Sequence, residues 1–332
     1  MQKMLLSAVG IIGAVFVCLA AVRAAIPWLQ QSAQNLSEKI ADNRTVDGGN
    51  RTADGENGAA DGGNGIVDGE NGAAGADLGG LYSPCAILLD ADTGEVLAEK
   101  NSRLQSYPAS LTKIMTALLV IEYAGNLDES VWMPSDIYDQ LYAEGASMAG
   151  FLPGEETTLR ELLYGILLPS GAECCLTAAR YIAGSEDAYV ELMNQRASEL
   201  GMDNTHFTNC TGLQDTAHYS SPADIAVLLR EALQNVTFRE IFTSEYYYVQ
   251  PTEQHPEGFT FWSTLFSQEG SNTDGVILGG KTGYTQEAGL CLASLLSAGG
   301  REYILVTMGA PGSHETEPYH IEDALNVGRQ LG

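Results

Sequence analysis

The sequence predicts an α+β domain in which an antiparallel sheet is flanked by helices and joined to an all-helical lobe. Two short strand patterns stand at 85–100, and a mostly helical stretch follows from residue 110 to a helix that starts at 221. Three further strand patterns with a final helix fill 276–330. Consecutive strands joined by short turns favour antiparallel pairing, and the last helix is expected to pack on the sheet. A cleft between the sheet and the lobe is then the expected place for a functional site.

The strands are predicted from apolar runs bounded by turn residues. Residues 85–90 and 95–100 flank Ala-Asp-Thr-Gly, a pattern typical of a hairpin. Short turns also separate the strand patterns near the end of the chain. These later elements are expected at 276–279, 289–297 and 302–309, with the closing helix at 321–330.

Capping residues mark the helix boundaries in the middle of the chain. Apolar residues at helical spacing indicate a helix over 110–123. Thr158 and Glu161 form the pattern of a capping box. Ser221 followed by Pro222 is typical of a helix start. Two further helices are expected at 172–183 and from Ser185 to Gly201.

The N-terminal segment 1–32 is predicted to be a membrane anchor or a signal peptide. Its 19 residues 4–22 carry no charge and lie between Lys3 and Arg23. This length approaches the ~20 residues that span a bilayer and exceeds the roughly 7–15 of a usual signal-peptide core. Val22-Arg23-Ala24 also fits a cleavage site, so both alternatives stay open, with the uncleaved anchor favoured. In either case the rest of the chain is expected to be exported.

Residues 33–80 are predicted to be a flexible acidic linker. A heptad rich in Asn, Gly and Asp recurs here and places Asp47, Asp54, Asp61 and Asp68 at a regular interval. No apolar seam accompanies the period, which argues against a coiled coil. Calcium-binding solenoids with regular aspartates use a nonapeptide unit, so this repeat predicts a tether rather than a calcium site. The folded domain is expected at 81–332.

The composition argues against several classes of function. Asp and Glu number 43 against 16 Lys and Arg, which gives a formal net charge of −27. Such a surface repels phosphate backbones, so nucleic-acid binding is not expected. The five histidines and six cysteines show no HExxH or CxxC spacing, which argues against a zinc site. We therefore expect no metal and no cofactor.

Three short motifs carry the candidate chemistry. Ser110 and Lys113 stand at the start of a predicted helix, Ser170-Gly-Ala lies between two helices, and Lys281-Thr-Gly follows a predicted strand. A lysine three residues after a serine lies on the same helix face, within reach of its hydroxyl. Burial in an otherwise apolar helix, together with a second cation, favours the neutral amine that a lysine base requires. The alternative is an N-capping serine followed by an exposed lysine.

Taken together, these motifs resemble the signature of penicillin-binding proteins and class A β-lactamases. The surrounding sequence is similar to the low-molecular-mass D-alanyl-D-alanine carboxypeptidases of serine peptidase family S11 over essentially all of 82–330. The resemblance implies a β-lactamase/transpeptidase-like fold. It is carried by the stretches 90–119, 152–173, 201–209, 212–226 and 279–294.

The resemblance also implies acyl transfer in two steps. Ser110 would attack the carbonyl of the penultimate D-alanine of a peptidoglycan stem pentapeptide and release the terminal D-alanine. Water would then hydrolyse the acyl-enzyme. Lys113 would accept the serine proton, and Ser170 would relay a proton towards the leaving amine.

The third motif would bind the substrate, by the same resemblance. Lys281 would supply a cation for the terminal carboxylate, and Thr282, beside Gly283, would donate a hydrogen bond to it. The backbone N–H groups of Ser110 and Tyr284 would form an oxyanion hole. In other enzymes, removal of one oxyanion-hole donor lowers the catalytic rate about 10²–10³-fold. The implied partners are peptidoglycan stem peptides, β-lactam inhibitors and, through the N-terminus, the membrane. The implied location is the extracytoplasmic face of a bacterial cell membrane.

Two departures from the family pattern leave alternatives open. Ala172 stands where the second motif of the family has asparagine. Glu173 after it is expected to be a solvated first-turn acid, and the alternative is that it compensates for the missing amide. The chain stops at Gly332, without the further β domain and amphipathic helix of many relatives, which favours anchoring through the N-terminus. One alternative is a β-lactamase, although no segment matches the glutamate-bearing loop of class A enzymes. The other is a catalytically weak penicillin-binding or sensing domain, supported by Ala172.

Overall fold

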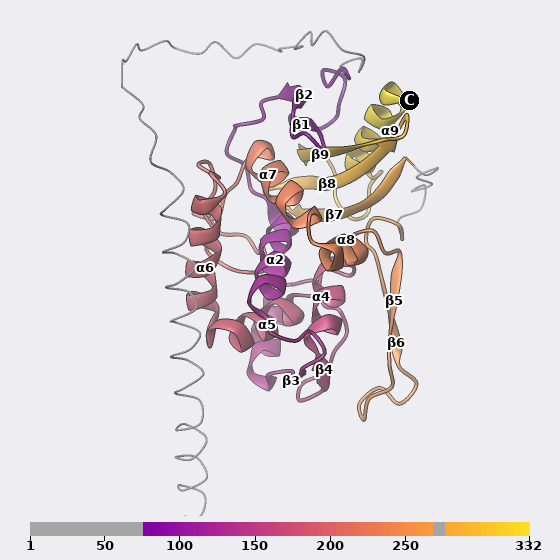
Figure 1. Cartoon of the computed structure of the whole chain (residues 1–332). Coiled ribbons are helices and arrows are strands. Elements are labelled where there is room, and N and C mark those ends of the chain that lie inside the picture. The colour runs from indigo at the N-terminus through magenta and orange to yellow at the C-terminus, as the bar shows by residue number, and fades with distance from the viewer. Residues whose placement is uncertain (1–75, 268–275) are drawn as a thin grey trace, which may run out of the picture. The chain divides into compact units, whose positions relative to one another are not determined.

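A computed structural model of the chain describes residues 76–267 and 276–332 (Figure 1). The predicted anchor at 1–32 and the predicted linker up to residue 75 lie outside the described residues. Within those two ranges, no helix has both the length and the apolar character required to cross a membrane.

An antiparallel sheet of five strands forms the upper part of the described domain in Figure 1. The N-terminal hairpin joins the C-terminal strands because its first strand pairs with the last one, with Ile87 opposite Val306. The predicted antiparallel sheet is therefore confirmed. Its strands, in spatial order, are β2 (Val96–Lys100), β1 (Cys85–Asp90), β9 (Arg301–Ala310), β8 (Gly289–Ala298) and β7 (Ile277–Thr285).

Helices cover both faces of this sheet. Side chains along β1 point alternately to the two faces of the sheet. Ile87 and Leu89 lie in a hydrophobic core shared with the helical lobe, whereas Ala86 and Leu88 lie in a second core on the opposite face. That second core is completed by α9 (Tyr319–Leu331), which packs on β8 and β9. Because β1, β8 and β9 are buried on both faces, their sequences are almost continuously apolar.

The helical lobe surrounds α2 (Lys113–Tyr123), in which every residue from Lys113 to Val120 is buried. The predicted caps are present: Thr158 and Glu161 form a capping box, and the side chains of Ser185 and Ser221 each accept a hydrogen bond from a first-turn N–H. The other long helices of the lobe are α4 (Leu159–Leu167), α5 (Ala172–Ala183), α6 (Glu186–Glu199) and α7 (Pro222–Leu233).

Several short elements were not predicted from the sequence. They include two small antiparallel ribbons, β3 (Ser130–Trp132) with β4 (Glu156–Thr158) and β5 (Tyr246–Val249) with β6 (Phe259–Trp262). The short segments η2 (Ser135–Ile137), α3 (Tyr138–Ala143) and α8 (Val236–Phe242) complete the set.

Three predicted boundaries differ from the structure. The helix expected over 110–123 begins as a separate 3₁₀ turn, η1 (Ala109–Thr112). The strand expected to end at residue 279 continues as β7 to Thr285, because pairing of Lys281 with Ala293 overrides the weak strand preference of two glycines. The folded domain also begins before the predicted residue 81, since Ala76 and Leu78 are buried in the core between the sheet and α9.

Candidate active site

Ser110 lies in a turn whose conformation is fixed by its neighbours. The preceding residue, Ala109, has φ +46°, in the left-handed region that costs energy for a residue with a side chain. The loop at Gly212 packs directly on this turn: a Cβ added to Gly212 would lie 1.9 Å from the carbonyl oxygen of Ala109. Tertiary packing therefore holds Ser110 in place before any substrate binds.

Lys113 is the immediate neighbour of the Ser110 hydroxyl. Its Nζ lies 3.1 Å from Ser110 Oγ and donates to the carbonyl oxygen of Thr211 at 2.6 Å. The side chain is buried, with 3% exposure, and burial lowers its pKa below the ordinary lysine value. Ser110 lies inside the 3₁₀ turn, whose N-cap is Pro108, and the N-cap of the following helix is Thr112, so Ser110 is not a capping residue. The alternative of a capping serine with an exposed lysine is therefore wrong.

The loop 209–213 contains the backbone carbonyl of Thr211, which accepts the hydrogen bond from Lys113. Asn209 Oδ1 accepts hydrogen bonds from the backbone N–H groups of Gly212 at 2.7 Å and Thr211 at 3.2 Å. Its amide also donates to Leu213 O at 3.0 Å, so Asn209 fixes the carbonyl that receives Lys113. Sequence reasoning missed Asn209. The signal was an Asn followed by Thr and Gly, which is typical of a side-chain-stabilised turn.

His218 supports the same region from the core. The backbone N–H of Thr208 donates to its Nδ1 at 3.1 Å, which leaves Nε2–H to donate to Thr112 Oγ1 at 2.8 Å. Burial lowers the pKa of His218 to about 4, so the ring is neutral at physiological pH. These contacts give His218 a structural role in the core.

Strand β7 brings the third motif against the turn of Ser110. A Cβ added to Gly283 would lie 3.1 Å from Ser110 N and 3.1 Å from Pro108 O, so a larger residue would crowd the backbone of that turn. Lys281 is fully buried and donates to Thr282 O at 2.9 Å. Burial lowers the pKa of Lys281, and the nearby Lys113 lowers it further.

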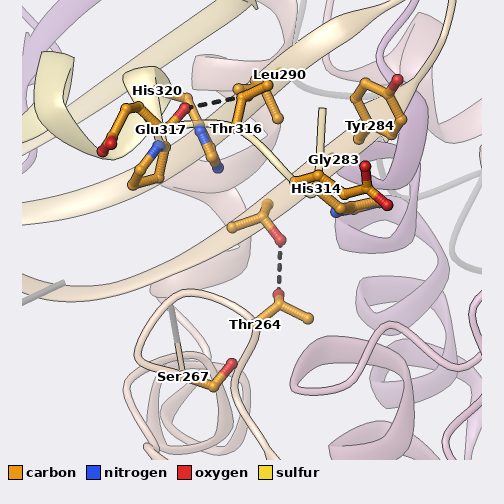
Figure 2. Close-up of a pocket in the computed structure, with 12 residues that line it drawn as sticks. Thr264, Ser267, Gly283, Tyr284, Leu290, His314, Thr316, Glu317 and His320 are labelled. Atoms are coloured by element: carbon orange, nitrogen blue, oxygen red, sulfur yellow. Dashed lines mark hydrogen bonds between the residues drawn. The ribbon is translucent and has the colours of Figure 1, made fainter. Parts of the chain in front are cut away.

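A pocket of about 550 Å³ lies along the outer side of β7 (Figure 2). Thr282, Gly283 and Tyr284 form one wall, and the segment from His314 to Pro318 forms another. Thr282 Oγ1 and Thr264 Oγ1 are 2.6 Å apart and both line the pocket, while Tyr284 meets His314 edge-on at 4.7 Å between ring centroids. Thr264 carried no recognisable signal in the sequence.

Ser170 lies in the break between α4 and α5, as predicted. Its φ is +68°, and the flanking Gly171 N–H donates to Gly165 O at 2.8 Å, which shapes a tight turn. The hydroxyl is buried and has no hydrogen-bond partner among the described residues. Ser170 is thus not hydrogen-bonded to Ser110 or Lys113 in this structure.

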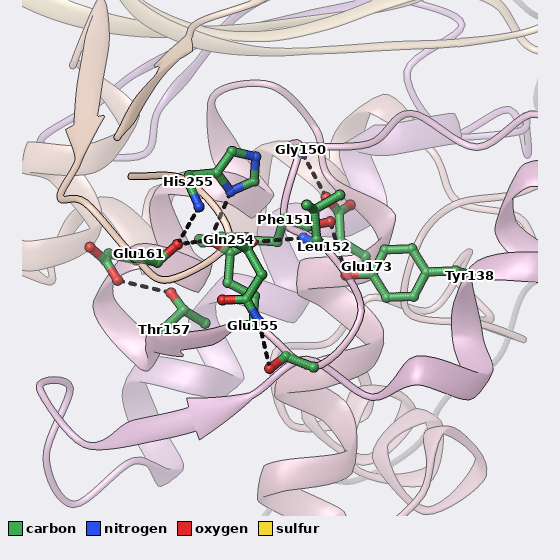
Figure 3. A network of polar contacts seen from close by, with 12 residues as sticks. Tyr138, Gly150, Phe151, Leu152, Glu155, Thr157, Glu161, Glu173, Gln254 and His255 are labelled. Carbon is green, nitrogen blue, oxygen red and sulfur yellow. Dashed lines mark hydrogen bonds and ion pairs between the residues drawn. The ribbon is translucent and has the colours of Figure 1, made fainter. Parts of the chain in front are cut away.

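Glu173 differs from its expected environment. The sequence predicts a solvated acid, but the side chain is fully buried and accepts hydrogen bonds from the backbone of Ala149 and Gly150 (Figure 3). The chain segment that buries it lies more than twenty residues earlier, which a local pattern cannot reveal. In the two described ranges, no three His, Cys, Asp or Glu side chains are grouped in a way that would hold a metal ion.

Two curated relatives each match about two thirds of the chain. D-alanyl-D-alanine carboxypeptidase DacF of Bacillus subtilis is 40% identical over 234 residues, which cover 68% of this chain and 57% of DacF. DacA of Escherichia coli is 32% identical over 230 residues, which cover 67% of this chain and 55% of DacA. The chain therefore spans a little over half the length of each of these relatives.

Solved structures show the same fold. The crystal structure of the Streptomyces K15 DD-transpeptidase superposes with a TM-score of 0.69 at 27% identity, covering 75% of this chain and 97% of that one. A D-alanyl-D-alanine carboxypeptidase from Mycobacterium tuberculosis gives 0.65 at 25% identity, with 79% and 95% covered. These likenesses confirm the predicted transpeptidase-like α+β fold. Residues 74–312 match the family described as D-alanyl-D-alanine carboxypeptidase, peptidase S11, and the chain belongs to that family.

Proposed function

We propose that this protein is a serine-type D-alanyl-D-alanine carboxypeptidase that removes the terminal D-alanine from peptidoglycan stem pentapeptides and is acylated by β-lactams. The observation that carries the proposal is the 3.1 Å approach of Lys113 Nζ to Ser110 Oγ. A buried amine beside a serine hydroxyl is an arrangement that activates the serine as a nucleophile. The matching family supports the choice of substrate.

In this proposal Ser110 Oγ attacks the penultimate carbonyl while Lys113, in its neutral form, accepts the hydroxyl proton. Two ammonium groups in one buried site oppose each other, so we propose that Lys113 is neutral when it accepts the proton and that Lys281 is charged once the carboxylate of the substrate binds beside it. The N–H groups of Ser110 and Tyr284 would stabilise the oxyanion. The position of Gly283 against Ser110 N supports this, because it brings the β7 backbone to the attacking residue.

The terminal carboxylate of the peptide would bind along β7. Thr282 would donate to it from the pocket wall, and the buried charge of Lys281 would favour an anion there. Ser170, whose buried hydroxyl has no protein partner among the described residues, would relay the proton to the departing amine. Free hydrogen-bonding capacity in a buried hydroxyl supports a contact with substrate.

We further propose that residues 1–32 hold the protein at the outer face of the cell membrane and that residues 33–80 tether the domain. The uncharged run 4–22 and the Asp-Gly-Asn repeat support this arrangement. A bilayer anchor and a flexible tether would let the domain reach stem peptides in the wall.

The test is to incubate the full chain with a stem pentapeptide ending in D-Ala-D-Ala and, separately, with penicillin. The proposal predicts release of free D-alanine and a slowly hydrolysed penicillin adduct. Rapid penicillin turnover without an adduct would identify a β-lactamase instead. An adduct without D-alanine release would identify a binding domain, and absence of both would contradict any acyl-transfer role.

A further inference from the structure

His320 is a buried histidine in the first turn of α9, and it lines the pocket beside β7. Only 1% of the residue is exposed, and Figure 2 shows its ring pointing into the pocket, on the side opposite Thr264. Its Nδ1 is buried and has no hydrogen-bond partner among the residues that the structure describes. A buried ring nitrogen without a partner costs free energy, because it has given up its hydrogen bond to water. The pocket therefore contains a polar atom that a bound ligand can satisfy.

Two threonine hydroxyls line the same pocket. Thr264 Oγ1 and Thr282 Oγ1 lie 2.6 Å apart, so one of these hydroxyls donates its hydrogen to the other. The accepting hydroxyl keeps its own hydrogen, which can be donated to a ligand. Together with an N–H at Nδ1 of His320, the pocket then offers one O–H donor and one N–H donor. A carboxylate accepts through two oxygens and matches such a pair.

The charged groups around the pocket differ in their exposure. Lys281 precedes Thr282 on β7, is fully buried, and is the cation that the proposed function places beside the carboxylate. Glu315 and Glu317 also line the pocket, but both are exposed, so solvent and salt screen their repulsion of an anion. The buried end of the pocket, where His320 lies, therefore favours a negatively charged group.

The ring of His320 is neutral at pH 7 in the free protein. Burial, with a smaller contribution from the nearby His314, lowers the pKa of His320 to about 4. A neutral imidazole carries hydrogen on only one of its two nitrogens. A carboxylate at Nδ1 selects the tautomer with hydrogen on that atom, so the ring can bind an anion as a directed donor without becoming charged.

We propose that His320 is a substrate-binding residue whose Nδ1–H donates to the terminal carboxylate of the stem peptide, next to the hydroxyl of Thr282. The inference rests on the proposed function, since it assumes that this carboxylate lies along β7. The start of α9 then forms the end of the site that recognises a free C-terminus. His320 makes the protein prefer peptides that end in a carboxylate over peptides whose C-terminus is blocked.

The experiment compares the full-length wild type with His320→Leu on two peptides. One is the stem pentapeptide ending in D-Ala-D-Ala, and the other is the same peptide ending in D-alaninamide. Chromatography of the tetrapeptide product gives kcat/KM for each peptide. His320→Leu should lower kcat/KM for the free acid about ten- to hundredfold, because it removes one hydrogen bond to a charged group. The amide should be affected much less, and an undiminished preference for the free acid would overturn the inference.

His320→Asn tests whether the lost donor is the cause. The side-chain amide nitrogen of asparagine lies at the same number of bonds from the backbone as Nδ1 of histidine, so it can donate from nearly the same place. This variant should recover most of the preference for the free acid. A folded His320→Asn protein that is as impaired as His320→Leu would show that the ring acts through its bulk, which would count against the proposal.

Asp323→Asn is the matched packing control. Asp323 is buried one turn further along α9, does not line the pocket, and accepts hydrogen bonds from Tyr82 N at 2.8 Å and Ser83 N at 2.9 Å. Its replacement should lower the unfolding temperature and leave the ratio of the two kcat/KM values as in the wild type. An equal loss of that ratio in Asp323→Asn would indicate a displaced helix and contradict a direct contact of His320 with the peptide.

The outcomes separate this inference from the proposed function. If the wild type releases tetrapeptide from neither peptide, the function fails. If the wild type is active and prefers the free acid, and His320→Leu keeps that preference, only the inference fails. Should His320→Leu not fold, the ¹⁵N spectrum of histidine-labelled Ser110→Ala protein, which should bind the pentapeptide without cleaving it, decides the matter. The Nδ1 signal of His320 should shift with the free acid more than with the amide, and equal spectra would overturn the proposal.

Discussion

The carbonyl oxygen of Ala109 lies where the side chain of residue 212 would have to be. A Cβ on Gly212 would approach that oxygen to 1.9 Å and Ser110 N to 3.0 Å, and Gly212 itself has φ +80°. The turn that presents Ser110 and the loop that binds Lys113 therefore fit together only because residue 212 is glycine.

Gly212→Ala should displace the turn of Ser110. We expect a loss of about 1–3 kcal/mol in the free energy of unfolding, since a methyl group must be forced against backbone. The acylation rate should fall more than the stability loss alone explains. Thermal unfolding measures the stability, and penicillin labelling measures the acylation rate. Gly184→Ala is a suitable control, because Gly184 also has positive φ but has open space around its Cβ position. Equal acylation by the two variants would contradict the assigned role of the contact.

The protonation of Lys113 should determine how the acylation rate rises with pH on the acid side of its profile. Burial lowers its pKa, so the neutral amine becomes available below the ordinary lysine value of about 10.4, and acylation should rise with pH over that range. Lys113→Arg should reduce acylation about 10²–10⁴-fold at every pH, because a guanidinium cannot accept the proton. Lys100→Arg, at a lysine that bonds Leu81 O at 3.1 Å, serves as the control. Substantial acylation by Lys113→Arg would exclude lysine as the base.

His218 should make stability depend on pH. Its pKa is about 4 in the folded protein and 6.5 in its ordinary state, so between these values the unfolded chain binds a proton that the folded chain does not. Stability should therefore fall as pH decreases from about 6.5 to about 4, by about 3 kcal/mol in total from this residue. The free energy of unfolding, measured with denaturant across this pH range, should depend less on pH in His218→Gln than in the wild type. The exposed His206, replaced by Gln, should leave the profile unchanged, and an equal response of both variants would contradict the account.

Thr264 should help to bind the carboxylate end of the peptide. Its hydroxyl lies 2.6 Å from that of Thr282 in the pocket wall, so Thr264→Val would leave Thr282 without this partner. We expect kcat/KM for the pentapeptide to fall about five- to tenfold, mainly through KM. Thr264→Ser should restore most of the loss because it keeps the hydroxyl. Unchanged kinetics in Thr264→Val would remove this residue from the site.

The sequence predicted those parts of the site that depend on local spacing. Ser110 and Lys113 are three residues apart on one turn, so their contact follows from helix geometry. The fold class could also be predicted, because capping boxes and apolar strands are local signals. Residues far apart in the chain gave no such signal. Thr264 meets Thr282 across 18 residues, and Glu173 is buried by a segment 24 residues away.

Strand β7 illustrates why the boundaries were harder to predict. Two consecutive glycines within it, at 279 and 280, are weak strand formers, and the predicted strand ended at the first. In the structure, β8 supplies a continuous ladder of partners from Ile277 to Thr285, with one irregularity near Gly279. Tertiary pairing therefore carried the strand through the third motif, where the backbone approaches Ser110.

The most direct measurement is to locate the penicillin adduct on the full chain by peptide mapping with tandem mass spectrometry. The account predicts a single penicilloyl group on Ser110 and no adduct on Ser110→Ala, whose thermal unfolding should match that of the wild type. An adduct on another residue, or labelling that persists in folded Ser110→Ala, would contradict the assignment of Ser110 as the nucleophile.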